Sequence, residues 1–145
     1  MSGSYFVDTN VLVYARDASE PQKQELAEQW LTFLWESRNG RLSIQVLNEY
    51  YATVTQKLDP GLRPALARKD VRDLMAWQPI SLDTQTLENA WTVQDRFKLS
   101  WWDSLIVSAA QISGCKYLLT EDIQNQQDLY GLQVVNPFKE NPPRK

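Results

Sequence analysis

The chain has 145 residues, of which 43% are hydrophobic and 23% charged, and its formal net charge is −3. This profile fits one globular domain, and the slight negative charge argues against a broad basic surface that binds duplex DNA. No apolar run approaches the ~20 residues that cross a membrane, and no basic segment precedes an apolar stretch near the N-terminus, so we expect a cytoplasmic protein without a secretory signal.

Histidine is absent, and Cys115 is the single cysteine. Catalysis by a histidine base, a Ser-His pair or a Cys-His pair is therefore excluded, and so is a zinc site of nitrogen and sulfur ligands. We expect Cys115 to be a buried small hydrophobe. Any metal site must be built from carboxylates, which select hard cations such as Mg²⁺ or Mn²⁺.

Short apolar runs alternate with helical patterns along the first half of the chain. The pattern predicts a strand at residues 5–7, a short helix at 10–16, and a longer helix that begins at Ser19-Pro21 and ends near residue 38. A strand at 41–44 then precedes a helix at 46–58.

The second half continues the alternation. It predicts a helix at 64–77, a short strand at 79–82, a helix at 83–98 capped by Asp83, a helix at 100–113 opened by Ser100, and strands at 117–119 and 132–135. Strands separated by helices of this length indicate parallel pairing in an α/β sheet with both faces covered. We expect a single domain over 1–139 and a disordered tail over 140–145.

Four carboxylates stand where a charge is awkward. Asp8 and Asp122 follow apolar runs, Glu49 borders the apolar face of its helix, and Asp103 points along the apolar stripe of another. In a parallel sheet, ligands bind beyond the carboxyl ends of the strands. Crowded carboxylates repel one another and resist desolvation, so a shared cation is the simplest thing that would hold them together.

Each acid also has a purely structural explanation. Asp8 can cap the following helix, and Asp103 can be the acid of a capping box. Glu49 can be a solvated boundary residue, and Glu121 competes with Asp122 for the fourth position. When Asp8 or Glu49 is considered alone, the structural explanation is favoured. When the four acids are considered together, one shared metal site is favoured.

Four sequence segments resemble a known family. Residues 8–14, DTNVLVY, resemble the N-terminal signature of the PIN domain, and specifically of VapC-type toxins of toxin–antitoxin pairs. Residues 43–49, 102–110 and 119–122 are similar to the second, third and fourth acidic motifs of that family. The resemblance extends from about residue 6 to residue 137.

The resemblance implies a three-layer α/β/α sandwich with a short, mainly parallel sheet. It implies an Mg²⁺- or Mn²⁺-dependent endoribonuclease that acts on RNA, forms a homodimer and is held inactive by a cognate VapB-like antitoxin. The catalytic, metal-binding acids would be Asp8, Glu49, Asp103 and Asp122. The supporting polar residues would be Thr9, Asn10 and Thr120.

On this interpretation a metal-activated water attacks phosphorus, and the products carry a 5′-phosphate and a 3′-hydroxyl. Arg16 lies just after the first motif, and Lys69 and Arg72 belong to a loose basic cluster. All three are candidate RNA contacts, weighed against an ordinary solvated surface.

Three other functions compete. The chain could be a non-catalytic PIN-like module that binds RNA or protein, or a housekeeping RNA-processing nuclease. It could also be a phosphotransfer or phosphatase domain with Asp8 as a covalent nucleophile. That last chemistry needs a second acid close by, where Asn10 stands.

The aromatic residues carry two further expectations. Apolar stripes place three tryptophans in the core: Trp30, Trp77 and Trp91. The other three could stack on a base or line a groove for a partner helix: Trp35, Trp101 and Trp102. The helix that carries Glu49 could extend into a dimer surface through Tyr50, Tyr51 and Val54.

Overall fold

The structure, a computed structural model, describes residues 3–143. Its helices and strands follow one another in this order: β1 (Tyr5–Val7), α1 (Thr9–Tyr14), α2 (Pro21–Ser37), β2 (Gly40–Arg41), α3 (Ile44–Gln56), α4 (Pro64–Leu74), the 3₁₀ helix η1 (Met75–Trp77), α5 (Thr84–Phe97), α6 (Trp101–Ile112), β3 (Tyr117–Leu119), β4 (Asp128–Leu129) and β5 (Leu132–Val135).

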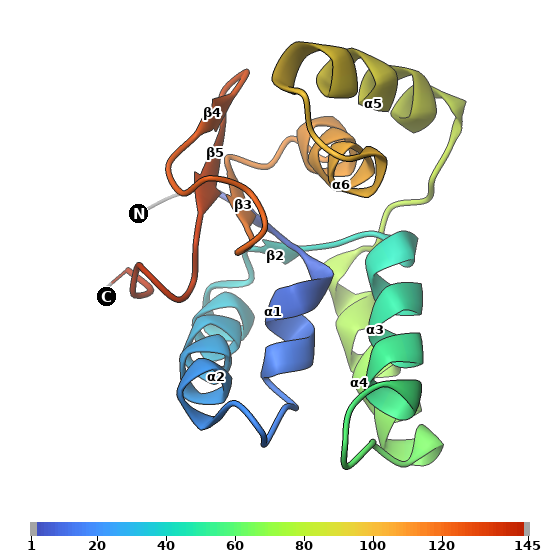
Figure 1. Cartoon of the computed structure of the whole chain (residues 1–145), viewed down its shortest axis with the longest axis vertical. Coiled ribbons are helices and arrows are strands. Elements are labelled where there is room, and N and C mark those ends of the chain that lie inside the picture. Colours follow the sequence, from blue (N-terminus) through green and yellow to red (C-terminus); the bar gives the residue numbers. More distant parts are fainter. Residues whose placement is uncertain (1–2, 144–145) are drawn as a thin grey trace.

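A five-stranded sheet in the order β2-β1-β3-β5-β4 forms the centre of the described chain (Figure 1). β1 pairs in parallel with β2 and β3, β3 pairs in parallel with β5, and only β4 runs antiparallel to its neighbour β5. Val7 lies beside Leu119, which lies beside Val135. The carboxyl ends of β1, β3 and β5 therefore meet at one edge.

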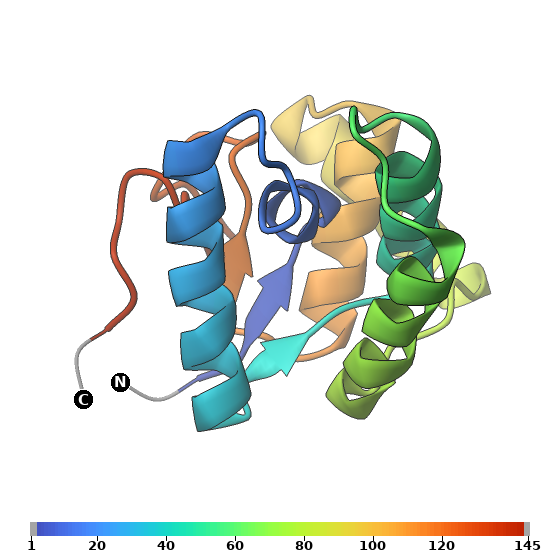
Figure 2. The same cartoon turned by 90° about the horizontal axis from the view of Figure 1, so that it is seen from below.

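Helices cover both faces of this sheet. In Figure 1, α1 and α2 lie on one side of the strands and α5 and α6 on the other. Figure 2 shows α1 between α2 and the pair formed by α3 and α4. The predicted three-layer α/β/α architecture with a mainly parallel sheet is confirmed.

The strands at the centre are buried on both faces. Parallel strands with helices on each side read as continuous apolar runs rather than alternating ones. The side chains that carry this burial in β1 and β3 are Phe6, Val7, Leu118 and Leu119. Cys115 is also buried, as expected.

The predicted strand at 41–44 is wrong after its first residue, because β2 ends at Arg41. Ile44 begins α3, because the Ser43 hydroxyl accepts a hydrogen bond from the amide of Val46 at 3.2 Å and so caps the helix. The predicted strand at 79–82 is reduced to one parallel bridge between Ser43 and Ile80.

The start of α2 also differs from the prediction. Glu20 occupies the cap position without a side-chain cap, and Pro21 is the first helical residue. The Ser19 hydroxyl donates to the carboxylate of Asp17 at 2.5 Å instead of capping the helix. Capping at Asp83 and Ser100 agrees with the prediction.

The predictions about the aromatic residues are confirmed in part. Trp30 and Trp77 are buried as expected, but Trp91 is 53% exposed and stacks beside Trp101 at 6.4 Å between ring centroids. The proposed dimer surface on the Glu49 helix is wrong for two of its residues, because Tyr50 and Val54 lie in the core.

The segment after β5 is tied to α2. The indole of Trp30 donates to the carbonyl of Pro137 at 3.1 Å and to that of Glu140 at 2.9 Å. Of the tail expected to be disordered, the first residue is therefore hydrogen-bonded, and residues 144–145 lie outside the described chain.

Candidate metal centre

Three aspartates meet at the carboxyl edge of the sheet. Asp8 directly follows β1, Asp122 lies in the loop after β3, and Asp103 is in the first turn of α6. Each of them offers a carboxylate oxygen within 4.8 Å of the others. The parallel pairing of β1 with β3 brings two of these acids together, and α6 supplies the third.

Asp8 serves two purposes with its two carboxylate oxygens. It is only 5% exposed, and its Oδ1 accepts the amide of Thr9 at 2.7 Å, which caps α1. Its Oδ2 accepts the hydroxyl of Thr120 at 2.8 Å. The helix cap and the place in the acid cluster, which competed as explanations, occur together.

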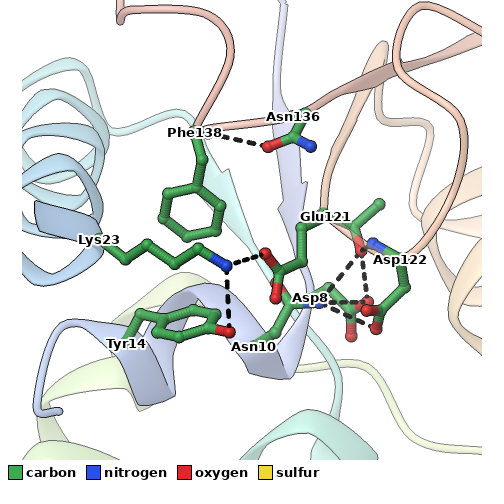
Figure 3. Close-up of polar contacts among 9 residues, drawn as sticks. Asp8, Asn10, Tyr14, Lys23, Glu121, Asp122, Asn136 and Phe138 are labelled. Carbon is green, nitrogen blue, oxygen red and sulfur yellow. Dashed lines mark hydrogen bonds and ion pairs between the residues drawn. The ribbon is translucent and has the colours of Figure 1, made fainter. Parts of the chain in front are cut away.

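Asn10 and Thr120 hold Asp122 against Asp8. Figure 3 shows the side chains of Asp8, Asn10 and Asp122 together. The amide nitrogen Nδ2 of Asn10 donates to Oδ2 of Asp122 at 3.0 Å and to Oγ1 of Thr120 at 3.2 Å. Thr120 Oγ1 also accepts the backbone amide of Asp122 at 3.1 Å. The supporting polar positions therefore cross-link the first turn of α1 to the loop after β3.

Asp103 enters the cluster from a capped helix start. The hydroxyl of Ser100 accepts the backbone amide of Asp103 at 3.1 Å. The cap thus uses the amide of this residue, while the half-buried carboxylate lies with those of Asp8 and Asp122.

The electrostatics fit a site that lacks a balancing positive charge. Burial raises the pKa of the Asp8 carboxyl from 3.8 to about 7, the hydrogen bonds from Thr120 and Thr9 oppose this rise, and the charges of Asp122 and Asp103 add to it. The pKa of Asp103 is also raised, mainly by burial and further by Asp122. A cation among these oxygens would offset both effects.

Two nearby oxygens strengthen the fit to a hard cation. The hydroxyl of Thr9 and the side-chain oxygen Oδ1 of Asn10 are buried, and no group in residues 3–143 hydrogen-bonds to either. Carboxylate, hydroxyl and amide oxygens are the donors that Mg²⁺ and Mn²⁺ prefer, directly or through water. The residues present therefore fit such an ion.

Glu49 stands apart from the three aspartates. Its side chain is exposed, and its Oε1 accepts the amide of Gln45 at 2.8 Å. It nevertheless lines the same cavity of about 500 Å³ as Asp8, Asp103 and Asp122. The structure places Glu49 on the wall of the cavity and outside the cluster of possible direct ligands.

Of the two acids that competed for the fourth position, Glu121 points away from Asp8 and Asp103, whereas Asp122 lies with them. The Glu121 carboxylate accepts the ammonium of Lys23 at 2.8 Å (Figure 3). The same ammonium lies over the rings of Tyr14 at 4.7 Å and Phe138 at 5.1 Å. Glu121 thus joins the loop after β3 to α2, and Asp122 is left to the cluster.

The three basic residues proposed as RNA contacts are not gathered at the acids. Arg16 forms two hydrogen bonds with Asp70, at 2.9 and 2.7 Å, and Lys69 pairs with Asp73 at 2.9 Å on the exposed face of α4. Arg72 is exposed on the same helix. Their contact with RNA stays a prediction.

Sequence reasoning missed two residues beside the site. Gln45 lines the acid cavity and holds Glu49, and its position four residues earlier on the same helix was a usable signal. Lys23 has no such signal, because its partner Glu121 lies 98 residues away.

Comparison with known proteins identifies the family. A profile of the PIN domain matches residues 5–132. A toxin–antitoxin complex from Klebsiella pneumoniae has a similar fold, with a TM-score of 0.64 at 17% identity over 92% of this chain and 98% of that one. The DNA-bound VapBC of Salmonella typhimurium gives 0.62 at 14% identity, covering 90% and 96% of the two chains.

The VapC20 toxin of Mycobacterium tuberculosis, described as cleaving the sarcin–ricin loop, gives a TM-score of 0.56 at 21% identity over 79% of this chain and 87% of that one. No curated protein matches the sequence. Within residues 3–143, no helix combines the length and hydropathy of a membrane span. On the profile match, which covers most of its length, the chain belongs to the PIN domain family.

Proposed function

We propose that this protein is an Mg²⁺- or Mn²⁺-dependent endoribonuclease that acts as a VapC-type toxin. The observation that carries the proposal is the meeting of Asp8, Asp103 and Asp122 within 4.8 Å at the edge of the sheet where ligands of α/β proteins bind. No histidine is present to supply another base.

The four acids have different tasks in this proposal. Asp8 and Asp103 would hold the ion directly, and Asp122 and Glu49 would hold its waters or a second ion. When bound, the cation would supply an activated water as the nucleophile, so that a P–O bond forms from this water while the P–O3′ bond breaks and leaves a 3′-hydroxyl. A carboxylate of the cavity wall takes the proton, which is the role proposed for Glu49.

The partners follow from the same proposal. RNA is the substrate, a VapB-like antitoxin is the inhibitor, and the active form is a homodimer in the cytoplasm. The toxin–antitoxin complexes from Klebsiella pneumoniae and Salmonella typhimurium, which have a similar fold, support the pairing with an antitoxin.

Cleavage of RNA by the purified protein tests the enzymatic part. We expect cleavage with Mn²⁺ or Mg²⁺, loss of cleavage on chelation, and products with a 5′-phosphate and a 3′-hydroxyl. Asp103→Asn should reduce the rate by at least about 100-fold, because an ion held through one fewer carboxylate is bound and positioned less well. Asp95→Asn, an exposed acid on α5 outside the cavity, is the matched control.

Three outcomes would contradict this proposal. Products with a 2′,3′-cyclic phosphate would exclude a water nucleophile. A trapped aspartyl-phosphate on Asp8 would favour phosphotransfer instead. RNA binding without metal-dependent cleavage would leave a non-catalytic module. Growth arrest on expression of the chain, relieved by a co-expressed small neighbour, separates a toxin from a housekeeping nuclease.

A further inference from the structure

A second cavity opens beside the acid cavity. It has a volume of about 700 Å³, and its lining residues are Ile44, Gln45, Asn48, Glu49, Ser81, Leu82 and Trp102. Three of these residues, Gln45, Glu49 and Trp102, also line the cavity that holds the aspartates. The two cavities are therefore neighbours that share these three side chains, and a group bound in the second cavity would lie next to one bound at the acids.

The second cavity has the chemistry of a base-binding pocket. Trp102 is 64% exposed, and Ile44 and Leu82, on the other elements that line the pocket, are also exposed. Among the described residues, 3–143, Glu49 is the sole charged one in its lining, and no lysine or arginine lines it. A phosphate would be repelled here, whereas an uncharged ring finds apolar walls.

A buried acceptor without a donor adds an independent sign of a missing ligand. Gln45 is only 7% exposed, and its Nε2 donates to Glu49. No group in residues 3–143 donates to its Oε1. Buried side-chain oxygens are normally paired, so an amino or imino group of a ligand that reaches this oxygen would supply the donor that residues 3–143 do not.

We propose that this pocket binds one unstacked base of a single-stranded RNA, with Trp102 as the stacking platform and Gln45 as an acceptor at its edge. The proposal deepens the proposed nuclease function, because it names a subsite next to the scissile phosphate. Aromatic side chains commonly hold splayed-out bases of single strands, and a base inside a duplex is not free to stack on them. The enzyme should therefore prefer single strands or loops to duplexes.

Binding without cleavage tests the pocket. The variant Asp8→Asn serves as a non-cleaving background, and the probe is a fluorescently labelled single-stranded RNA of mixed sequence. A chain of the same length in which every nucleotide is abasic is the control probe. We expect Trp102→Ala to weaken binding of the RNA by about 10-fold, as for loss of one stacked base, and to leave binding of the abasic chain unchanged.

Two further variants separate stacking from general disturbance. Trp102→Tyr keeps a ring and should recover most of the affinity. Trp91→Ala removes a comparably exposed tryptophan that lines neither cavity, so it should bind both probes as the background does.

Each remaining outcome is decisive. Equal binding of RNA by the background and Trp102→Ala, no binding of RNA at all, or equal loss on the abasic chain would overturn the pocket. A change in oligomer size on Trp102→Ala, with RNA binding unchanged, would show that a second copy of the chain covers this surface.

Failure of the pocket proposal can be distinguished from failure of the nuclease proposal. Metal-dependent cleavage by a Trp102→Ala variant with unaltered kcat/KM would keep the nuclease and remove the subsite. Base-dependent binding through Trp102 without any cleavage by the wild type would keep the base-binding pocket and contradict the nuclease function.

Discussion

At the scale of single residues, Asp8 is a carboxylate whose burial and acidic neighbours oppose its ionisation, while its hydrogen bonds favour it. Its side chain caps α1, accepts the hydroxyl of Thr120 and stands beside two other carboxylates, all while buried. Such a group is costly to ionise without a cation. The metal-free protein should therefore show this cost directly.

Stability of the metal-free protein should fall as the pH rises. An aspartate titrates near 4 in the unfolded chain, whereas burial raises the pKa of Asp8 to about 7 in the folded one. The folded form binds the extra proton between these values, so its contribution is complete below about pH 4 and is lost as the pH rises through about 7. The loss is on the order of 4 kcal/mol.

Urea unfolding in a chelator, from about pH 5 to about pH 8, measures this effect. The comparison with Asp8→Asn isolates it, because asparagine keeps the helix cap and cannot ionise. The difference in unfolding free energy between the variant and the wild type should grow with pH. A constant difference would contradict the raised pKa.

Substitution of Lys23 should destabilise the fold more than substitution of its partner Glu121. Glu121→Gln leaves the ammonium of Lys23 over the rings of Tyr14 and Phe138, whereas Lys23→Met leaves a carboxylate near the acid cluster without its cation. We expect Lys23→Met to cost about 1 kcal/mol and Glu121→Gln less. Denaturant unfolding of both variants and of the double variant measures this, and equal costs would contradict the argument.

At the scale of helices and strands, most of the fold was predictable because it rests on local patterns. β1 and β3 are apolar runs, β5 is apolar except for Gln133, and the caps Asp83 and Ser100 mark two helices correctly. β4 was missed because its hairpin turns through Tyr130 and Gly131 at positive φ, and a tyrosine gives no turn signal at such a position.

Trp91 was predicted to lie in the core because the apolar stripe of its helix was considered without the helix that packs against it. The buried residues of α5 are Thr86, Ala90 and Val93, so small side chains face α6 and the tryptophan lies outside. Which stripe of a helix becomes buried depends on its neighbour. That information is not local to the helix.

Removing the cap of α6 should affect metal binding as well as stability. Ser100→Ala loses the bond to the amide of Asp103, which costs about 1 kcal/mol and frees the first turn that carries the acid. Asp83→Ala removes an equivalent cap from α5, where the Thr86 amide donates at 2.9 Å, and serves as the matched control.

Urea unfolding and a Mn²⁺ titration separate the two effects. Both variants should lose similar stability, and Ser100→Ala alone should bind Mn²⁺ several-fold more weakly. Equal Mn²⁺ affinity in the two variants would show that the cap does not position Asp103.

At the scale of the whole molecule, the candidate site was predictable in part. Parallel strands place their carboxyl ends together, so Asp8 and Asp122 were expected to meet, and an acid on a nearly uncharged helix was expected to join them. The separation of Glu49 from the cluster was not predictable. It depends on how α3 is set against the sheet and on the bond to Gln45.

Metal binding should stabilise the whole fold. An ion that binds the folded chain alone adds about 2.7 kcal/mol when its free concentration is 100 times its dissociation constant. We expect Mn²⁺ to raise the Tm by several degrees and a chelator to reverse the rise. Asp103→Asn should lose most of this response while Asp95→Asn keeps it. An equal response in both variants would place the ion elsewhere.

The cross-link of Asn10 to Thr120 and Asp122 joins segments that are 110 and 112 residues apart in the sequence, and β3 in turn pairs with β5. During translation, Asp8 therefore emerges long before the residues that hold it in the cluster. A nascent chain cannot gather its carboxylates before β3 and β5 have been synthesised, and truncated products that stop short of β5 should be inert.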